Sequence, residues 1–451
     1  MGTRLQGHRA QCLEGELISD RFCRRHTVFC YMINEATKEY IRRHRMDDVR
    51  LLALKQSKRL SQDALDRVVA ETIDLPIALQ QIDGWQTSRH KLPEWAAVEG
   101  LIYPPHLSME QCSSEQTARY KATLAGNGQS FVDLTGGFGV DFFYMTRGFC
   151  HSVYVEQQEE LCTIARHNFP LLGLNATIIC CSAIDYLAQM EPVDVIYLDP
   201  ARRDAHGART YSIADCTPNV LAMLPQLQEK ANTVILKLSP MLDWHKAVSD
   251  LGCVSEVHIL SVNNECKELL LVLRWQTSTS LRLVCANEGT IFECSPSKGP
   301  RRSQQGTETV PVRDQSLTNI LDLDEILANG KLVYLYEPNA SIMKAGCFDE
   351  IGHFYHICEL SANSHLFVSL DEIGNFPGRR FCIERITTMN KHELKEALGS
   401  MERANITVRN FPMSVDALRK KLRLKEGGDA FIFATTDADG RHLLLICRKI
   451  G

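Results

Sequence analysis

The stretch Phe131-Val-Asp-Leu-Thr-Gly-Gly-Phe-Gly-Val-Asp141 joins an apolar run to a turn that is rich in glycine. The run has the character of a β-strand and ends in an acidic residue, Asp133, and a helix is expected after the turn. Glycine is needed where the backbone takes a positive φ or approaches a ligand closely. A second short strand, 152–155, ends in Glu156, and an acidic residue in that place is suited to hold a ribose diol. The sequence therefore predicts a nucleoside-binding crevice at the carboxyl ends of parallel strands.

Missing features narrow the choice of nucleoside. A dinucleotide fingerprint needs a third glycine where Phe142 stands, and the chain has no Gly-x-x-x-x-Gly-Lys-Ser/Thr phosphate loop. The glycine turn also lacks a basic residue, and the Asp133 carboxylate would repel phosphate and attract an amino group. A ligand with a ribose, a flat base and a cationic amino-acid tail fits this pattern, which favours S-adenosylmethionine. The alternative is a glycine turn that merely links strand to helix.

A second apolar strand ends in an acid within Asp194-Val-Ile-Tyr-Leu-Asp199-Pro-Ala-Arg-Arg203. With both motifs, the chain resembles the class I S-adenosylmethionine-dependent methyltransferases. The resemblance implies that residues 133–139 form the cofactor loop and residues 199–202 the catalytic loop. In relatives with Asp-Pro-Pro-Tyr at this point, the catalytic loop holds a base or amide nitrogen for methylation.

A closer resemblance covers the chain from about Met32 to its C-terminus. The layout is similar to that of bacterial methyltransferases with a ferredoxin-like insert and a C-terminal THUMP-like domain, which implies an RNA substrate. The similarity runs through the strings Glu110-Gln-Cys-Ser-Ser-Glu115, Leu236-Lys-Leu-Ser-Pro240, Tyr336-Glu-Pro-Asn339 and Phe376-Pro-Gly-Arg-Arg380.

The strand-end pattern and the resemblance together give the candidate cofactor residues. Asp133 is expected near the amino group of the cofactor and Glu156 on its ribose hydroxyls, although both acids could simply cap the next helix. The position that carries an acid for the adenine amine in the family is occupied by Ser182, with Asp185 three residues later. The Ser182 hydroxyl could bind the base instead, with Asp185 serving only as a helix cap. The full set is Ser114, Asp133, Thr135, Gly136, Gly137, Gly139, Glu156, Ser182, Ala183 and Asp185.

Ser114 enters this set because Ser113 or Ser114 is expected to cap a helix that runs into Leu124. Helix N-termini attract anions, so this end could receive the carboxylate of the methionine moiety. The alternative is an ordinary capped helix that packs on the edge of the sheet.

The candidate catalytic residues are Asp199, Pro200 and Arg202. Methyl transfer is an in-line displacement, so the protein mainly has to position an electron-rich acceptor. Asp199 and the Pro200 carbonyl could accept hydrogen bonds from an exocyclic amine. Arg202 replaces the tyrosine of Asp-Pro-Pro-Tyr relatives, and its guanidinium could stack on a base, bind a phosphate or form a structural salt bridge. Cys216 is a weaker candidate, as a nucleophile for carbon methylation.

Composition excludes several classes of protein. The 451 residues are 44% hydrophobic and 23% charged, as in ordinary globular proteins, with a net charge of −5. The chain has no apolar run near the ~20 residues of a membrane helix and no apolar signal core at its start, so we expect a cytoplasmic protein without membrane contact. Its 17 cysteines are scattered without Cys-x-x-Cys, so no metal site is expected. The basic run 419–425 could bind RNA or be a solvated helix face.

Strand patterns alternate with helix patterns, notably 158–168 and 220–230, and predict an α/β fold: a Rossmann-like, doubly wound sheet of the class I methyltransferase type. The expected strands are 131–134, 152–155, 177–180, 193–198 and 234–237. Two β-rich runs, 254–262 and 268–274, predict a terminal antiparallel hairpin, which dinucleotide folds lack. A helical pattern over residues 34–86 predicts an N-terminal helical domain, and C-terminal α+β modules, with a helix over 391–404 in the last of them, complete the expectation. The predicted parts are a poorly ordered extension (1–31), the helical domain (32–95), the methyltransferase domain (96–277), a ferredoxin-like module (278–375) and a THUMP-like domain (376–451).

From these features we expect a methyltransferase that uses S-adenosylmethionine and acts on a base nitrogen of tRNA or rRNA. A protein or small-molecule methyltransferase is the enzymatic alternative, since the fold does not choose a substrate. A third reading is an RNA-binding protein that keeps the cofactor fold without catalysis; the intact Asp199-Pro200 pair argues against it. The sequence predicts no oligomeric state.

Overall fold

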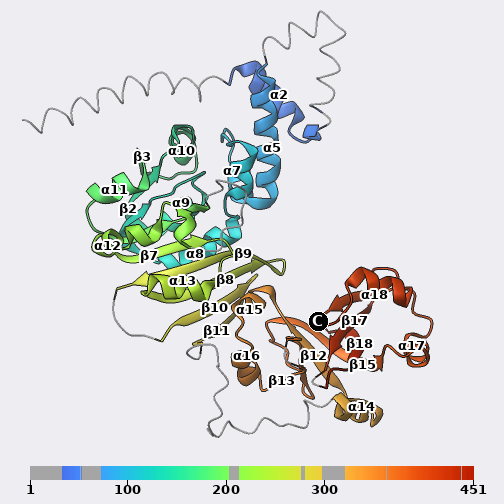
Figure 1. The fold of residues 1–451 in the computed structure, drawn as a ribbon. Coiled ribbons are helices and arrows are strands. Elements are labelled where there is room, and N and C mark those ends of the chain that lie inside the picture. The colour runs from blue at the N-terminus through green and yellow to red at the C-terminus, as the bar shows by residue number, and fades with distance from the viewer. Residues whose placement is uncertain are drawn as a thin grey trace, which may run out of the picture. The chain divides into compact units, whose positions relative to one another are not determined.

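The computed structural model describes residues 33–50, 52, 73–202, 213–275, 280–296, 320–361, 363–437 and 439–450 (Figure 1). The chain forms two compact units. The first unit runs to Val254 and includes Leu271–Thr277, and the second comprises Ser255–Leu270 and Ser278–Gly451. The predicted poorly ordered extension over residues 1–31 lies outside the described residues.

The first unit begins with helices, as predicted. Two of them start at side chains that accept a hydrogen bond from a backbone N–H in the first turn: Asn34 from Thr37 at 2.7 Å, and Asp74 from Ile77 at 3.1 Å. Such caps satisfy donors that have no partner within the helix. Residue 51 and residues 53–72, which contributed to this helical pattern, lie outside the described residues. The helices here are α2 (Glu35–His44), α5 (Leu75–Lys91), α6 (Pro93–Ala96) and α7 (His106–Gln111).

A parallel sheet forms the centre of the first unit, in the strand order β7-β4-β1-β2-β3. The predicted strands 177–180 and 193–198 are found with these bounds, and each of the other three begins three residues before its predicted start. The strands are β1 (Gly128–Asp133), β2 (Phe149–Glu156), β3 (Thr177–Cys180), β4 (Val193–Leu198) and β7 (Ala231–Leu238). The alternation of strands and helices therefore gives the predicted doubly wound fold.

Aromatic side chains fill the core between this sheet and its helices. Phe142 from α9 packs among Phe131, Tyr154 and Phe169, and its ring stacks on Phe169 at 5.4 Å between centroids. The helical and short elements of the first unit are α8 (Glu115–Ala125), α9 (Val140–Met145), η1 (Thr146–Gly148), α10 (Glu159–Leu171), α11 (Ala183–Gln189), η2 (Ile213–Asp215), α12 (Val220–Lys230) and α13 (Trp244–Leu251), with the antiparallel pair β5 (Ala201–Arg202) and β6 (Cys216–Thr217).

The predicted terminal hairpin is confirmed as β8 (Val254–Val262) and β9 (Glu265–Arg274). Asn263 and Asn264 turn it with φ of 51° and 57°, values that asparagine tolerates better than most residues. The neighbour of β9 on its other side is β7. Strand β8 also pairs in parallel with β10 (Arg282–Asn287), which forms a hairpin with β11 (Thr290–Cys294).

A seven-stranded sheet lies in the second unit, in the order β13-β14-β12-β15-β18-β17-β16. Leu323 of α14 packs with one set of buried side chains, and Leu418 of α18 packs with another. Phe433 belongs to the first set and Ile432 to the second, so successive residues of β17 point to opposite faces and each face has its own core. The strands are β12 (Val333–Pro338), β13 (Cys358–Glu359), β14 (Phe367–Ser369), β15 (Gly378–Thr388), β16 (Asn405–Val408), β17 (Ala430–Thr436) and β18 (His442–Lys449).

One helix of the second unit is shorter than predicted. The sequence pattern favoured a helix over 391–404, but α17 ends at Leu398 because Gly399 takes a φ of 53° that the helix cannot continue. None of the described helices of either unit is both long and apolar enough to span a membrane. The helices of this unit are α14 (Ile320–Ala328), α15 (Ala340–Ala345), α16 (Phe348–Tyr355), α17 (Lys391–Leu398) and α18 (Val415–Leu422).

Candidate functional site

Three acidic residues stand at the carboxyl ends of neighbouring strands in the first unit. Asp133 ends β1, Glu156 ends β2 and Asp199 directly follows β4. The parallel registers place Asp133 beside Tyr154 of β2 and Tyr197 of β4. The three carboxyl groups therefore belong to one edge of the sheet, where α/β folds bind their ligands.

The glycine turn after β1 is shaped by aromatic rings. A Cβ atom on Gly136 would lie 2.1 Å from the Tyr154 ring, and one on Gly139 would lie 2.7 Å from the Phe169 ring. The missing Cβ atoms of these two glycines therefore make room for aromatic rings of the protein itself, and contact of the two residues with a cofactor stays a prediction. Gly137 differs, because it has a φ of 56° and its Cβ position is open. Its backbone N–H donates to Glu156 and its carbonyl oxygen accepts from the Tyr154 hydroxyl, so the polar groups of this residue hold the turn in place.

Glu156 is already tied to this turn. Its carboxylate accepts a hydrogen bond from the Gly137 backbone N–H at 3.0 Å and another from the Gln158 N–H at 2.9 Å. The residue is buried. Each carboxylate oxygen can accept a second hydrogen bond, so the group is held in place and keeps acceptor capacity for hydroxyl groups.

Asp133 has one satisfied and one unsatisfied carboxylate oxygen. Oδ1 accepts a hydrogen bond from the Thr135 N–H at 2.8 Å, whereas Oδ2 is buried and receives no hydrogen bond from a described residue. Burial raises the pKa of Asp133 well above its usual range, and the charges of Asp141, Asp199 and Glu156 raise it further. A buried, unpaired acceptor is costly, and a cationic donor such as an ammonium group would satisfy it.

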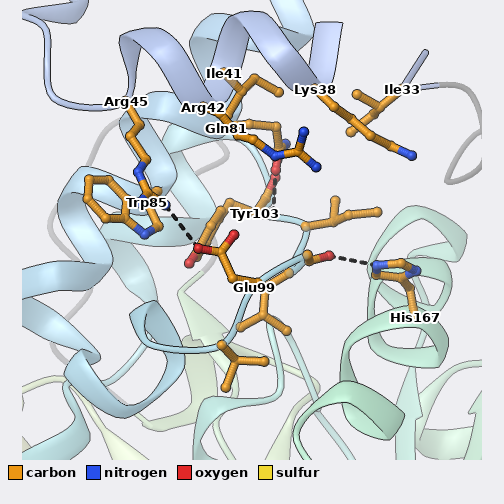
Figure 2. A pocket seen from close by; sticks show the side chains of 14 residues that line it. Ile33, Lys38, Ile41, Arg42, Arg45, Gln81, Trp85, Glu99, Tyr103 and His167 are labelled. Atoms are coloured by element: carbon orange, nitrogen blue, oxygen red, sulfur yellow. Dashed lines mark hydrogen bonds and ion pairs between the residues drawn. The ribbon is translucent and has the colours of Figure 1, made fainter. Parts of the chain in front are cut away.

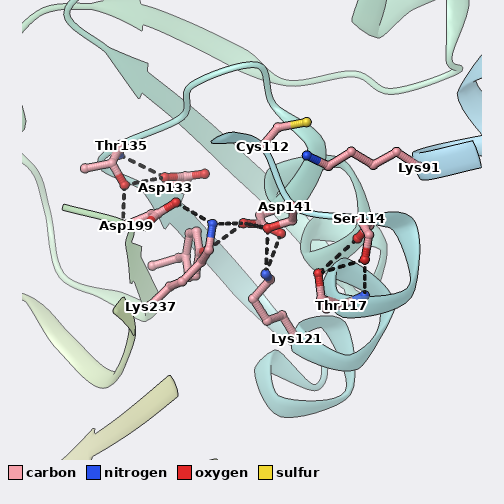
Figure 3. Close-up of polar contacts among 12 residues, drawn as sticks. Lys91, Cys112, Ser114, Thr117, Lys121, Asp133, Thr135, Asp141, Asp199 and Lys237 are labelled. Atoms are coloured by element: carbon pink, nitrogen blue, oxygen red, sulfur yellow. Dashed lines mark hydrogen bonds and ion pairs between the residues drawn. The ribbon is translucent and has the colours of Figure 1, made fainter. Parts of the chain in front are cut away.

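Asp199 is anchored on two sides (Figure 3). Its backbone N–H donates to Thr135 Oγ1 at 2.6 Å, and its Oδ2 lies 2.6 Å from Lys237 Nζ. The side chain is 37% exposed, so it can still meet a ligand. Burial of the carboxyl group raises the pKa of Asp199, Lys237 opposes this rise, and the charge of Asp141 adds to it.

Behind Asp199 lies a buried ionic cluster that the sequence analysis missed, drawn in Figure 3. Asp141 Oδ1 is 2.9 Å from Lys121 Nζ, while Oδ2 accepts hydrogen bonds from the Ser113 and Tyr197 hydroxyls at 2.8 and 2.7 Å. Lys237 Nζ lies 3.7 Å from the same Oδ2. Burial alone would raise the pKa of Asp141, but the lysines lower it to about 2.

The sequence held partial signals for this cluster. Asp141 ends the glycine-rich stretch, and Lys237 lies in one of the strings that carry the family resemblance. Lys121 is fully buried. The sequence could not show this, because most of the residues that precede Lys121 in α8 are polar or charged. Only the packing of α8 against α9 brings Lys121 to Asp141.

The remaining cofactor candidates lie at helix starts. Ser114 caps α8, as predicted, by accepting a hydrogen bond from the Thr117 N–H at 3.2 Å. Ser182 caps α11, whose first residue is Ala183. The Ser182 hydroxyl donates a hydrogen bond to the Asp185 carboxylate and accepts one from the Asp185 backbone N–H. The capping role that the sequence gave to Asp185 belongs to Ser182. Contacts of these residues with a cofactor stay a prediction.

Two catalytic-loop candidates are placed only in part. Pro200 is buried directly after Asp199, and Arg202 is described through its backbone in β5, opposite Cys216. The side chain of Arg202 lies outside the described part of the structure. Cys216 is 2% exposed, which does not suit a nucleophile that must reach a substrate.

Within the described residues, no group of three or more His, Cys, Asp or Glu side chains could hold a metal ion.

A separate pocket of about 290 Å³ lies among α2, α5, α10 and the segment 98–103 (Figure 2). It contains none of the residues predicted from sequence. Its Trp85 ring is covered by the Arg45 and Arg89 guanidinium groups, and Arg45 pairs with Glu99 at 3.1 Å.

Comparison with known proteins follows this geometry. Two family models match the second unit: a ferredoxin-like domain over residues 334–377 and a THUMP domain-like module over residues 378–449. The crystal structure of a putative methyltransferase from Porphyromonas gingivalis W83 is 30% identical, with a TM-score of 0.73, and the match covers 90% of this chain and 100% of that one. The chain belongs to this methyltransferase family.

Two further solved structures each match about a third of this chain. One is the Pyrococcus abyssi tRNA (uracil-54, C5)-methyltransferase with S-adenosyl-L-homocysteine, at 17% identity over 35% of this chain and 38% of that one, with a TM-score of 0.26. The other is TrmK of M. capricolum with S-adenosyl-homocysteine, at 10% identity over 35% and 67%, with a TM-score of 0.28. No curated protein matches the sequence.

The buried ionic cluster generates the first prediction. Replacing Lys121 by methionine should lower the free energy of unfolding of the first unit by about 3 kcal/mol, because Asp141 is left as an undercompensated buried charge. Urea unfolding near neutral pH measures this change. The loss should shrink as the pH falls from about 4 towards 2, since the lowered pKa of Asp141 stabilises the native state only while the group is ionised.

Lys246→Met is the matched control. Lys246 pairs with Asp250 at 2.8 Å on the exposed face of α13, and removal of that pair should cost less than about 1 kcal/mol. Equal losses in the two variants would contradict the structural role given to Lys121.

Proposed function

We propose that this protein transfers a methyl group from S-adenosylmethionine to a base nitrogen of RNA, either tRNA or rRNA. The observation that carries the proposal is the buried Oδ2 of Asp133, which receives no hydrogen bond from a described residue and stands at the start of the glycine turn. That oxygen fits the cationic amino group of the methionine moiety. Membership in the methyltransferase family supports the same reading.

The other strand-end groups fit the remaining parts of this cofactor. Glu156 is fixed on the next strand and keeps acceptor capacity for the ribose hydroxyls. The first turn of α8, which Ser114 caps, is suited to the methionine carboxylate. Ser182, Ala183 and Asp185 begin the helix after β3, where we place the adenine.

Asp199 and Pro200 are proposed to receive the acceptor. They follow the strand next to β1, and Thr135 links the two loops because its backbone N–H bonds Asp133 and its hydroxyl bonds Asp199. Methyl donor and acceptor would therefore be held by one small hydrogen-bonded unit, which satisfies the positioning demand of an in-line displacement.

The second unit supports RNA as the substrate. Its THUMP-like match coincides with a segment in which residues 401–451 contain ten basic and six acidic residues. Lys420, Lys421 and Arg423 are exposed at the end of α18, whereas Arg419 is turned inward towards Glu426. Exposed cations of this kind can grip phosphates without reading sequence. The alternative is a protein or a small molecule as the substrate. We propose that the protein acts in the cytoplasm.

The cofactor assignment predicts a binding change that depends on the amino-acid tail. Asp133→Asn should weaken S-adenosylhomocysteine binding about 10- to 100-fold in calorimetry, because a charge-assisted hydrogen bond is lost. Binding of 5′-methylthioadenosine, which lacks the tail, should be unchanged in the same variant. If both ligands weaken equally, or if NAD binds tightly and S-adenosylhomocysteine does not, the cofactor assignment is wrong.

The catalytic assignment predicts a loss of turnover without a loss of cofactor affinity. Asp199→Ala should reduce methyl incorporation into RNA to background, since the group faces the acceptor, and S-adenosylhomocysteine should still bind within a few-fold of the wild-type affinity. Asp250→Ala, on the exposed pair in α13, is the control that should keep full activity. Near-normal turnover of Asp199→Ala would disprove the placement of the acceptor.

The RNA assignment predicts an effect of salt. Neutralising Lys420, Lys421 and Arg423 together, each to glutamine, should weaken RNA binding and reduce the slope of log affinity against log salt by up to about 3, while cofactor affinity stays the same. The exposed lysines Lys246 and Lys267 offer a control pair in other elements. An unchanged slope would mean that the end of α18 is only solvated surface.

A further inference from the structure

Lys237 brings a positive charge to the place proposed for the acceptor. It lies near the end of β7, and its Nζ is 2.6 Å from Asp199 Oδ2. Its side chain is only 11% exposed, whereas that of Asp199 is 37% exposed. The side chain of Lys237 is therefore more buried than the carboxylate with which it pairs.

Neutralising Asp141 does not account for this position. Asp141 already has Lys121 at 2.9 Å and hydroxyl donors from Ser113 and Tyr197, while Lys237 is 3.7 Å away from it. The shorter and stronger contact of Lys237 is with Asp199. The buried Lys121–Asp141 pair is close to neutral by itself, so the charge of Lys237 acts mainly on Asp199 and on a group bound next to it.

Asp199 also keeps one carboxylate oxygen for a ligand. Oδ2 is taken by Lys237, the backbone N–H is taken by Thr135, and no described residue donates a hydrogen bond to Oδ1. An acceptor N–H can therefore bond to Oδ1. An ammonium group has three N–H donors, so Lys237 can hold Asp199 and also donate to an oxygen atom of the acceptor.

We propose that the acceptor is a lactam nitrogen of a base, an N–H next to a ring carbonyl as in guanine N1 or uracil N3, and that Lys237 binds the carbonyl oxygen. The inference rests on the proposed function and names the chemical class of its acceptor. Asp199 and Lys237 together match the donor and acceptor order of such a group, N–H to carboxylate and C=O to ammonium.

The charges balance along this reaction. The lactam N–H proton passes to Asp199 Oδ1, and the negative charge left on the base is shared with the carbonyl oxygen beside Lys237. The nitrogen lone pair then forms the bond to the methyl carbon, while the carbon–sulfur bond breaks and its electron pair stays on sulfur. Stabilisation of the developing oxyanion by a preorganised cation lowers the barrier.

An exocyclic amine fits the same geometry less well. Its nitrogen gains positive charge as the methyl group arrives, and an ammonium group in the wall of the crevice would repel that charge. An amine acceptor would need acceptors around it, and a lysine supplies none. The pair of Asp199 and Lys237 therefore suits guanine N1 or uracil N3 better than the exocyclic amines of adenine and cytosine.

The identity of the product tests the inference. Wild-type protein is incubated with S-adenosylmethionine that carries a CD3 group and with total RNA from a strain without the gene, and the nucleosides are analysed by mass spectrometry. Label in N1-methylguanosine or N3-methyluridine is expected. Label in a methylated exocyclic amine, a ring carbon or a ribose would overturn the inference but leave the methyltransferase function intact, and label in no nucleoside would overturn both.

A lysine variant gives an independent readout. Lys237→Met should lower kcat about 10²-fold near neutral pH, with smaller changes in KM and in S-adenosylhomocysteine affinity. Raising the pH from about 7 to about 9 should restore part of the rate, because the lactam then ionises without the help of Lys237. Lys237→Arg should retain more activity, and Lys246→Met should behave as wild type.

A role of Lys237 in folding alone gives a different pattern. In that case the loss in Lys237→Met would be the same at every pH, or the protein would unfold and lose S-adenosylhomocysteine binding too. A pH-independent loss in a folded variant would overturn the assignment of Lys237. If the variant does not fold, the nucleoside that the wild-type protein labels decides whether the acceptor is a lactam nitrogen.

Discussion

The buried carboxylate of Asp141 is the constraint on which the site depends. It lies in the first turn of α9, directly after the glycine turn, and it binds groups from α8, β4 and β7. A buried ion is tolerated only when it is paired and hydrogen-bonded, so each of these elements is held at a fixed distance from the turn. Without Lys121, the Asp141 charge would lie in a low-dielectric interior without its nearest compensating charge.

This cluster gives two similar acids different properties. Asp133 is buried with one oxygen unsatisfied and a pKa well above the usual range, so it gains from a cationic partner. Asp199 already has such a partner in Lys237 and remains partly exposed. Asp133 is thus suited to a positively charged methyl donor and Asp199 to a methyl acceptor that carries a proton. Thr135 is hydrogen-bonded to both residues.

Several parts of the fold were predictable because they follow from local pattern. The strands 177–180 and 193–198 and the helix 220–230 were found with the predicted bounds, since short apolar runs between turn residues leave little freedom. Errors arose where one residue changes the backbone, as at Gly399, which ends α17 early. The glycine turn was also predictable, but the reason for Gly136 and Gly139 was not, because the rings that they face come from β2 and α10.

The sequence by itself determined the class of fold and the acids at the ends of the strands. Strand period, turn residues and an acid after each apolar run are local features, and parallel strands bring their carboxyl ends together whatever else the chain does. Only the tertiary structure decided which charges meet. Lys121, Asp141 and Lys237 are far apart in sequence and none is distinguishable by type from a surface residue; their pairing depends on burial and on the packing of α8, α9 and β7, which set distances that no local pattern encodes.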